Sequence, residues 1–373
     1  MKIALIYDRV NKIGGAERVL ETLHEIWPEA PLYTAVYWPQ GAPWAKDFKV
    51  IPSFLNKWPL APEHHEFYPW LTPLAFESFD FSEFDVVLSV TSAEAKGIMT
   101  KPKTLHLCYC LTPTRYLWSG YREYFKNKLR KFLAEPIVDY LRGWDKVAAQ
   151  RPDTFMAISR NVQHRIRKFY GREAIVIYPP IDIKKWRIEN GKLRSKEETP
   201  FFLVVSRLVP YKRVDIVVRA FNQLGWPLKI IGVGSEMEEL KRMSKPNIKF
   251  LGQLTDQELL GYYQDCRALI FPQVEDFGLV PLEAQSCGKP VIAFRGGGAL
   301  ETVLDKKTGT FFYPQTTRAL IKKLKEFKIN DYRAEDCREN AEKFDKEIFK
   351  KKFKQLVEEK NKNLPSTEPC FKK

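Results

Sequence analysis

The chain has 373 residues, which is long for a single hydrophobic core and comfortable for two domains of ordinary size. Hydrophobic residues make up 44% of the sequence and support globular folding, but no apolar run is long enough to span a bilayer or to form a signal-peptide core. The net charge of +15 points to nucleic acid, an anionic membrane surface or an anionic small substrate as a partner, or to a basic surface that aids solubility.

The six cysteines are scattered along the chain, without a Cys-x-x-Cys pair or a nearby cluster of histidines. This pattern argues against a zinc site and against a disulfide framework. We therefore expect reduced thiols and a cytoplasmic protein.

The first apolar run, Lys2 to Asp8, is typical of the first strand of a parallel sheet, and a helix is expected from about Ala16 to Ile26. Gly14 and Gly15 lie between them, where bare backbone N–H groups at a helix N-terminus can bind phosphate. A plain tight turn is the alternative. The two glycines do not form the Gly-x-Gly-x-x-Gly pattern of dinucleotide-binding proteins, which argues against a dehydrogenase.

Short apolar runs predict further strands in the first half of the chain. They cover Leu32 to Trp38, Val50 to Ser53, Val86 to Val90, Thr104 to Cys110 and Thr154 to Ser159. Between the last two lies a basic helical segment in which Lys126, Lys128, Arg130 and Lys131 alternate with aromatic and aliphatic residues. Such a segment indicates contact with a membrane surface, or an ordinary amphipathic helix on the domain core.

The second half alternates strictly between strands and helices. A strand broken by two prolines, Ala174 to Asp182, precedes it, and a polar stretch follows that strand. The expected strands are Phe201 to Ser206, Leu228 to Val233, Ile248 to Leu251, Ala268 to Phe271, Pro290 to Phe294 and Gly309 to Tyr313. Two helices are expected to begin with capping boxes, Ser235-x-x-Glu238 and Thr255-x-x-Glu258. This alternation predicts a second doubly wound parallel domain.

An acidic loop in this half carries the strongest functional signal. Glu275 follows the strand that ends at Phe271, and Glu283 lies near the start of a short helix that Gly288 is expected to end. Loops of this kind leave the carboxyl ends of parallel strands, where ligands bind, so both carboxylates should face one crevice. Gly278 lets backbone donors approach a ligand closely. The loop from Gly296 to Gly298 starts a second helix at the same edge. For Glu283 alone, attraction to the helix dipole is the alternative.

Two cations lie on one loop directly after a strand. Arg207 offers a planar fork of donors and Lys212 a mobile point charge, and both suit phosphate oxygens. Two solvated surface cations are the alternative. Their position in the same domain as the acidic loop favours a phosphate site.

An ordered set of motifs covers nearly the whole chain. It comprises Gly-Gly-Ala-Glu-Arg18, Ser-Arg-Asn-Val162, Ile-Tyr-Pro-Pro-Ile-Asp182, Ser-Arg-Leu-Val-Pro-Tyr-Lys-Arg-Val-Asp215, Glu275-x7-Glu283 and Gly-Gly-Ala-Leu-Glu301. The set resembles the retaining glycosyltransferases of the Glu-x7-Glu, two-Rossmann-domain family (glycosyl transferases group 1, family 4). Within that family it is most similar to bacterial cell-surface polysaccharide mannosyltransferases.

The resemblance implies an α/β chain of the GT-B type, with two doubly wound Rossmann-like domains facing a central cleft. The expected divisions are an acceptor-side domain at 1–177, a nucleotide-sugar-binding domain at 178–343, a helix at 344–360 that crosses back to the first domain, and a flexible tail at 361–373. The implied activity is transfer of a hexose to a lipid-linked or glycan acceptor, with mannose from GDP-mannose as the expected donor sugar. The implied location is the inner face of the cytoplasmic membrane.

The resemblance also assigns roles to residues. Arg207 and Lys212 would stabilise the diphosphate as the glycosidic bond breaks, and Glu275 would orient the transferred sugar. Glu283 would bind the ribose hydroxyls. Backbone donors at Phe277, Gly278 and Leu279 would contact sugar and diphosphate, and Gly14 and Gly15 the diphosphate from the other domain.

Two features bear on how such an enzyme would work. Relatives often have His-Thr-Pro where this chain has Leu111-Thr-Pro113, and His106 cannot replace that histidine because five residues along a strand reverse the side-chain face. A catalytically weak sugar-nucleotide binder is therefore an alternative, as is a nucleic-acid-binding protein on the ground of charge. The chain has no Asp-x-Asp pair, and hard cations prefer carboxylate oxygens, so we expect no metal and no other cofactor.

Overall fold

The structure of the protein is a computed structural model that describes residues 1–12, 14–121, 128–187 and 199–363, without the side chains of 128–131 and 133. The chain forms two compact units, one of residues 1–180 with 347–373 and one of residues 181–346. The predicted divisions at 177 and 343 lie close to these limits. Residues 364–373 of the predicted tail lie outside the described residues, as do Lys126 and the side chains of Lys128, Arg130 and Lys131 in the predicted basic segment.

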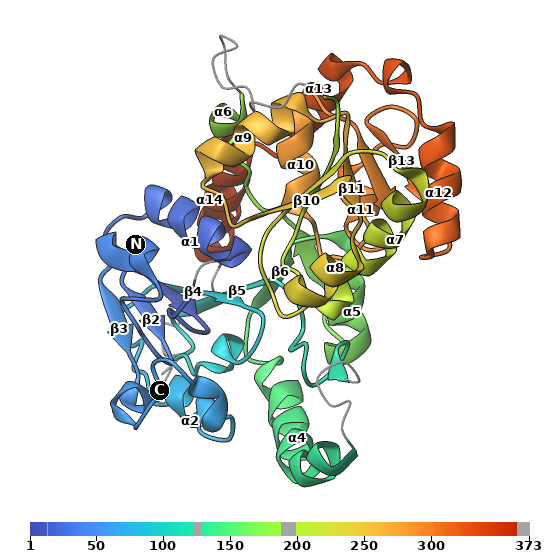
Figure 1. Cartoon of the computed structure of the whole chain (residues 1–373). Helices are drawn as coiled ribbons and strands as arrows, with labels where there is room; N and C mark the ends of the chain where they lie inside the picture. Colours follow the sequence, from blue (N-terminus) through green and yellow to red (C-terminus); the bar gives the residue numbers. More distant parts are fainter. Residues whose placement is uncertain (13, 122–127, 188–198, 364–373) are drawn as a thin grey trace, which may run out of the picture. The chain divides into compact units, whose positions relative to one another are not determined.

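The first unit is built on a seven-stranded parallel sheet with the order β3-β2-β1-β4-β5-β6-β7 (Figure 1). Its strands are β1 (Ile3–Tyr7), β2 (Leu32–Thr34), β3 (Val50–Pro52), β4 (Val86–Thr91), β5 (Leu105–Cys110), β6 (Thr154–Ala157) and β7 (Ala174–Val176). Its helices include α1 (Gly15–Ile26), α2 (Thr72–Glu77), α4 (Lys128–Ala148) and α5 (Arg160–Tyr170). Every residue of β1, β4 and β5 is buried, as expected of parallel strands covered on both faces.

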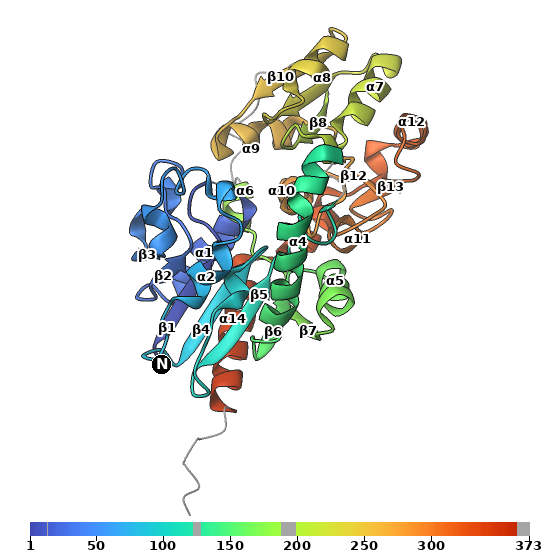
Figure 2. The same cartoon turned by 90° about the horizontal axis from the view of Figure 1, so that it is seen from below.

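The last helix, α14 (Lys346–Lys362), belongs to this first unit from Glu347 onward (Figure 2). Its buried face presents Phe349, Phe353 and Val357. The ring of Phe353 meets Tyr109 of β5 at 5.4 Å between centroids and Trp27, at the end of α1, at 6.3 Å. The helix therefore returns to the first domain, as the resemblance implied.

The second unit holds a six-stranded parallel sheet with the order β10-β9-β8-β11-β12-β13. Its strands are β8 (Phe202–Val205), β9 (Leu228–Ile231), β10 (Ile248–Gly252), β11 (Ala268–Phe271), β12 (Val291–Phe294) and β13 (Gly309–Phe312). Its helices are α6 (Ile183–Trp186), α7 (Val214–Leu224), α8 (Met237–Met243), α9 (Asp256–Asp265), α10 (Leu279–Ser286), α11 (Ala299–Thr302), α12 (Thr317–Glu326) and α13 (Ala334–Glu342). The strand order reverses between β8 and β11, so the loops after these two strands leave the sheet side by side.

Some predicted elements differ from the structure. Thr255 forms the expected capping box with Glu258 at the start of α9. The box predicted at Ser235 is wrong, because α8 begins at Met237 with Glu236 as its N-cap and no side-chain cap. There the backbone N–H of Glu236 donates to the carbonyl of Leu208 instead, at 2.9 Å. Two expected strands are shorter, since β2 ends at Thr34 and β7 at Val176.

Candidate functional site

The two loops predicted to carry the chemistry are neighbours in the second unit. β8 pairs with β11 in parallel, with Phe202 opposite Ala268. Arg207 and Lys212 follow β8, and Glu275 follows β11. The structure thus places the predicted cations and the predicted sugar-orienting carboxylate at one edge of one sheet, where open α/β sheets bind ligands.

Lys212 is 6% exposed and ends the short helical turn Pro210–Lys212. Its ammonium group forms an ion pair with Oε1 of Glu275, and it lies 5.3 Å from the centroid of the Tyr211 ring. A buried cation is costly unless it is paired, so Glu275 holds the charge of Lys212 in place. The pair unites the two residue types that the resemblance assigns to the leaving diphosphate and to the sugar.

Arg207 is exposed on the same loop. Its Nη2 donates a hydrogen bond to the hydroxyl oxygen of Tyr211 at 2.8 Å. Tyr211 therefore contacts both cations of the loop, a role that sequence reasoning did not assign to it. The only signal in the sequence was its position inside the Arg-x4-Lys spacing.

Two glycines after β9, Gly232 and Gly234, pack directly against the backbone of the loop that carries Arg207. A Cβ atom on Gly232 would lie 2.0 Å from the carbonyl oxygen of Ser206, and one on Gly234 would lie 2.3 Å from that of Leu208. The backbone N–H of Leu208 donates to the carbonyl of Val233 at 2.9 Å. Only glycine allows this backbone-to-backbone packing. Sequence analysis missed it, although a Gly-x-Gly spacing after a strand was visible.

The glycine loop at 296–298 packs against the acidic loop in the same manner. Gly298 donates its N–H to the carbonyl oxygen of Glu275 at 2.9 Å. A Cβ atom on Gly298 would lie 2.1 Å from the carbonyl oxygen of Phe277, and Gly297 has a φ of +61° with the backbone of Glu275 beside it. The helix that follows, α11, has only four residues. These glycines therefore hold the backbone that carries Glu275 in place.

Glu283 lies on α10 and is 3% exposed. Its Oε2 accepts a hydrogen bond of 2.8 Å from the hydroxyl of Tyr263, a fully buried residue of α9. The ring of Tyr263 packs edge-on against Trp186 at 5.5 Å between centroids. The carboxylate is thus oriented by a side chain that is itself held rigidly, and sequence reasoning missed Tyr263.

The start of α10 matches the expectation for the acidic loop. Gly278 precedes the helix with a φ of +96°, a conformation that favours glycine, and Leu279 is the first helical residue. Phe277 is buried and its ring meets Phe344 at 5.6 Å between centroids. Gly288 has a φ of +77° just after the helix, as predicted.

Gly14 and Gly15 lie in the first unit, where Gly14 is the N-cap of α1. A Cβ atom on Gly14 would lie 3.0 Å from Oε2 of Glu17. Glu17 is buried, accepts a hydrogen bond of 2.9 Å from Tyr7, and has its pKa raised by burial. The predicted phosphate contact of these glycines therefore lies next to a carboxyl group, and it stays a prediction.

His106 is fully buried within β5. Its Nε2 lies 2.9 Å from the hydroxyl oxygen of Ser89, and burial lowers the pKa of its imidazole to about 3. Leu111 follows the strand and donates its N–H to the carbonyl of Thr91 at 2.8 Å. His106 is thus a neutral residue of the sheet interior, in agreement with the strand-parity argument.

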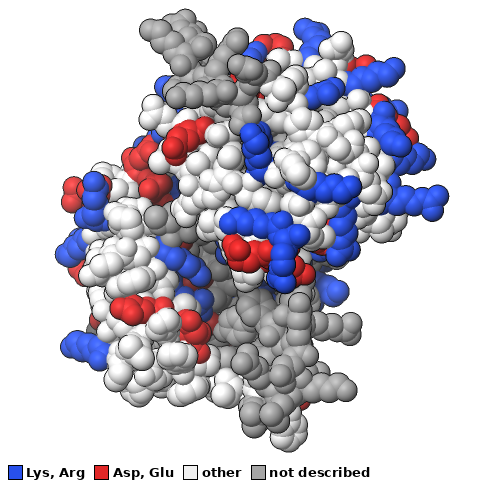
Figure 3. All heavy atoms as spheres, in the orientation of Figure 1, with Lys and Arg blue, Asp and Glu red and all other residues white. Residues whose placement is uncertain are grey.

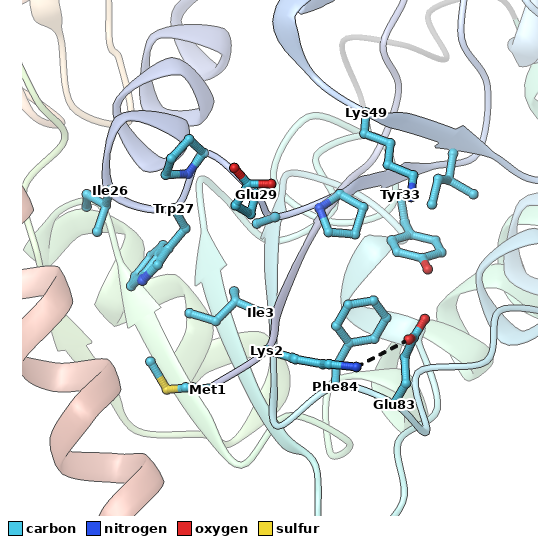
Figure 4. A pocket seen from close by; sticks show the side chains of 14 residues that line it. Met1, Lys2, Ile3, Ile26, Trp27, Glu29, Tyr33, Lys49, Glu83 and Phe84 are labelled. Atoms are coloured by element: carbon cyan, nitrogen blue, oxygen red, sulfur yellow. Dashed lines mark ion pairs between the residues drawn. The ribbon is translucent and has the colours of Figure 1, made fainter.

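A pocket of about 490 Å³ opens in the first unit at the amino ends of the strands (Figure 4). Met1, Trp27 and Phe84 help to line it, and Lys2 and Glu83 form an ion pair across it at 3.9 Å. Ligands of open α/β sheets bind at the opposite, carboxyl edge.

Within the described residues, no group of three or more His, Cys, Asp or Glu could hold a metal ion. No described helix is long and apolar enough to cross a membrane.

Residues 186–344, which contain Arg207, Lys212, Glu275 and Glu283, match the family model of glycosyl transferases group 1. They form a glycosyl transferases group 1 domain. The group 1 domain thus covers β8 to β13 and both loops of the site.

Curated relatives agree with this assignment. The chain is 28% identical over 212 residues to an uncharacterized glycosyltransferase of Methanocaldococcus jannaschii, covering 56% of this chain and 58% of the relative. It is 32% identical over 184 residues to a GDP-mannose-dependent alpha-(1-6)-phosphatidylinositol monomannoside mannosyltransferase of Mycolicibacterium smegmatis, covering 42% and 48%. The chain therefore spans about half the length of these relatives.

Solved structures show the fold. The Anabaena protein HepE in complex with UDP superposes with a TM-score of 0.74 at 19% identity, covering 96% of this chain and all of that one. Sucrose-phosphate synthase of Thermosynechococcus elongatus gives a TM-score of 0.75 at 17% identity, covering 96% and 99%. The fold of the chain is GT-B, with its group 1 domain as the second of two parallel-sheet units.

Proposed function

We propose that the protein is a retaining hexosyltransferase that moves mannose from GDP-mannose to a lipid-linked or glycan acceptor in cell-surface polysaccharide synthesis. The observation that carries this proposal is the Lys212–Glu275 ion pair, with Arg207 on the same loop, at the strand-order reversal of a group 1 domain. Positive charge and a carboxylate side by side suit a substrate that joins a diphosphate to a sugar.

The chemistry follows from this arrangement. The bond between the anomeric carbon and the diphosphate oxygen breaks, and the electron pair stays on the diphosphate. Arg207 and Lys212 stabilise that growing negative charge. Stabilisation of this kind, by charges already fixed in place, is usually the largest single contribution to the rate enhancement. The acceptor hydroxyl forms the new bond from the same face, and its proton passes to the leaving phosphate.

Glu275 and Glu283 would divide the recognition of the donor between them. Glu275 orients the hexose beside the scissile bond, and its ion pair with Lys212 links sugar position to phosphate position. Glu283, held by Tyr263, accepts hydrogen bonds from the ribose. Hydroxyl recognition by a buried carboxylate is selective, because a donor lacking the hydroxyl leaves the carboxylate unpaired.

Relatives support the choice of donor and acceptor. One is named for GDP-mannose and phosphatidylinositol monomannoside, and another, from Escherichia coli and 26% identical over 238 residues, is an O-antigen chain mannosyltransferase. The structural neighbour HepE binds UDP, so a UDP-sugar is the competing donor. A lipid-linked acceptor would bring the protein to the inner face of the membrane.

A panel of GDP- and UDP-sugars tested by thermal shift decides between these donors. We expect GDP-mannose to give the largest rise in melting temperature, because binding to the native state alone stabilises it. The anomeric configuration of the transferred hexose, read by NMR, then tests retention. If no nucleotide sugar stabilises the protein, the proposal is wrong.

Leu111 supports one second candidate, a sugar-nucleotide binder with weak turnover. The residue after β5 is aliphatic where relatives often have histidine. Such a protein would bind GDP-mannose as tightly as an active enzyme but would release GDP only slowly in the presence of acceptor. A Leu111→His variant that gains turnover would establish this reading.

A further inference from the structure

Exposed aromatic residues gather in the segment between β3 and α2 of the first unit. Trp58 is 41% exposed and Trp70 44%, and both contact the partly buried ring of Tyr68. The centroid of that ring lies 5.3 Å from that of Trp58 and 6.2 Å from that of Trp70, edge-on in both cases. We call these three residues the aromatic surface. Contiguous exposed apolar groups of this kind mark an interaction site.

The aromatic surface is held in place by the core of the first unit. Leu55 and Ala61 flank Trp58 in sequence and are fully buried in this core. The hydroxyl of Tyr68 donates a hydrogen bond of 2.9 Å to the carbonyl oxygen of Pro59. The rings therefore have defined positions, and a ligand that stacks on them has little disorder to remove.

This segment lies at the carboxyl ends of three neighbouring strands. It follows β3 directly, and Asn56 accepts a hydrogen bond of 2.7 Å from the backbone N–H of Tyr37, in the loop after β2. Asn11, in the loop after β1, donates one of 3.2 Å to the carbonyl oxygen of Pro62. The strands β1, β2 and β3 are paired in parallel. The segment therefore covers the edge at which open α/β sheets bind ligands.

An unused hydrogen-bond acceptor lies beside this segment. Asn11 is 7% exposed, and its Nδ2 also lies 3.2 Å from Nδ1 of His65. Its Oδ1 is buried and has no hydrogen-bond partner in the part of the chain that the structure describes. Buried polar atoms are almost always satisfied, so this oxygen points to a donor group that a ligand supplies, such as a hydroxyl.

The surroundings of the aromatic surface are acidic, although the whole chain carries a net charge of +15. Residues 54–77 contain one lysine, Lys57, and three glutamates, of which Glu63 and Glu66 are exposed. Burial lowers the pKa of the His65 imidazole to about 2, so this residue adds no positive charge. In Figure 3 the surface over α2 is largely white, while Lys and Arg side chains gather over α12 of the second unit. The charge therefore disfavours an anionic partner.

We propose that the aromatic surface binds an uncharged oligosaccharide, namely the sugars of the acceptor glycan that lie behind its reacting end. This inference rests on the proposed transfer to a glycan acceptor and adds a site for the part of the acceptor that does not react. The C–H groups on one face of a pyranose ring are weakly polarised and stack on the electron-rich face of an indole. The hydroxyls of the same ring stay available to acceptors such as the carboxylates of Glu63 and Glu66.

A bilayer and a second copy of the chain fit this surface less well. Anionic headgroups would meet Glu63 and Glu66, with only Lys57 in this segment to attract them. A two-fold interface would set the same acidic segment against itself. Neither objection applies to an uncharged glycan.

Isothermal titration calorimetry of the whole protein with linear mannose oligosaccharides tests the proposal. The Kd should fall by about tenfold or more from mannose to the hexasaccharide, because two stacking positions on one sugar chain bind as linked sites. Trp58→Ala combined with Trp70→Ala should remove this gain, whereas Trp58→Phe with Trp70→Phe should keep most of it because the aromatic faces remain. A hexasaccharide of galacturonic acid, equally long but anionic, should bind about fivefold more weakly at low salt.

A control variant removes apolar surface from the same segment without removing an aromatic face. Leu60 is 60% exposed and Leu74 51%, and changing both to Ala should alter hexasaccharide affinity by less than about twofold. All variants should keep the stabilisation by GDP-mannose, because the residues assigned to the donor in the group 1 domain are unchanged. That stabilisation also shows that each variant is folded.

Several outcomes would overturn the proposal. Three are equal wild-type affinity for mannose and the hexasaccharide, unchanged hexasaccharide binding by the double Ala variant, and an equal loss in the leucine control. Galacturonate binding as tight as that of the mannose chain would contradict an uncharged ligand. Binding to vesicles of phosphatidylcholine with phosphatidylglycerol in place of oligosaccharide, or dimerisation that the double Ala variant abolishes, would give the surface another partner.

The donor experiment separates this inference from the proposed function. If GDP-mannose and the other nucleotide sugars fail to stabilise the wild type, the proposed function is wrong. If GDP-mannose stabilises it and oligosaccharide binding does not depend on Trp58 and Trp70, only the role of the aromatic surface is wrong.

Discussion

Lys212 carries its charge in a nearly buried position, and Glu275 compensates it. We expect Lys212→Ala, and separately Arg207→Ala, to lower kcat by about a hundredfold, the scale observed when one preorganised charge-stabilising group is removed. Steady-state kinetics with saturating donor measure this. The matched control is Lys241→Ala on α8, whose ion pair with Glu238 is at the surface. Wild-type kcat in either site variant would refute the phosphate role.

Tyr263 contacts no expected part of the donor but fixes the carboxylate of Glu283. We expect Tyr263→Phe to raise the KM for donor by about tenfold and to leave kcat unchanged, since a hydrogen bond to a charged group contributes about 1.5–3 kcal/mol. A donor with a deoxyribose should bind wild type and variant equally weakly. Glu283→Ala should weaken donor binding further. If Glu283→Ala does so and Tyr263→Phe does not, the positioning role alone is wrong.

The sequence alone was enough to select those site residues whose charge suits the chemistry directly. Arg207, Lys212, Glu275 and Glu283 stood out because charges at loops after parallel strands suit a phosphorylated sugar. Tyr263 could not stand out in the same way. It is one aromatic residue in an amphipathic helix, and its contact with Glu283 depends on how α9 packs on α10, which the local sequence does not encode.

At the scale of elements, α9 and α8 form a natural comparison. Thr255 caps α9 through a full capping box, whereas the similar sequence at Ser235 caps nothing. We expect Thr255→Ala to lower the free energy of unfolding by about 1 kcal/mol and Ser235→Ala to leave it within about 0.5 kcal/mol of wild type. Urea denaturation followed by circular dichroism measures both. Equal losses would mean that Ser235 caps α8 in solution.

Apolar runs located nearly every strand, because a parallel strand covered on both faces needs several consecutive apolar residues. The order of the strands within each sheet could not be predicted in this way. β8 and β11 are adjacent although two strands and three α-helices separate them in sequence. Periodicity carries no information about such pairing, so the proximity of Lys212 to Glu275 was visible only in the folded sheet.

At the scale of the whole molecule, charge compensation at the donor site predicts independence from metal ions. Arg207 and Lys212 supply positive charge beside the place given to the diphosphate, and the sequence lacks an Asp-x-Asp pair. We expect turnover to be unchanged in excess EDTA, measured as GDP release, with a known Mg²⁺-dependent transferase as the control. Activity that EDTA abolishes and Mg²⁺ or Mn²⁺ restores would contradict the roles of both cations.

The return of α14 to the first unit has a consequence for synthesis of the chain. The rings of Phe349 and Phe353 cover Tyr109 of β5, yet the ribosome makes them only after the whole group 1 domain. The part of β5 that these rings cover therefore stays exposed until the group 1 domain has been synthesised. The first domain is therefore completed only after the second, and during that interval its exposed apolar surface is open to misassembly and to chaperones.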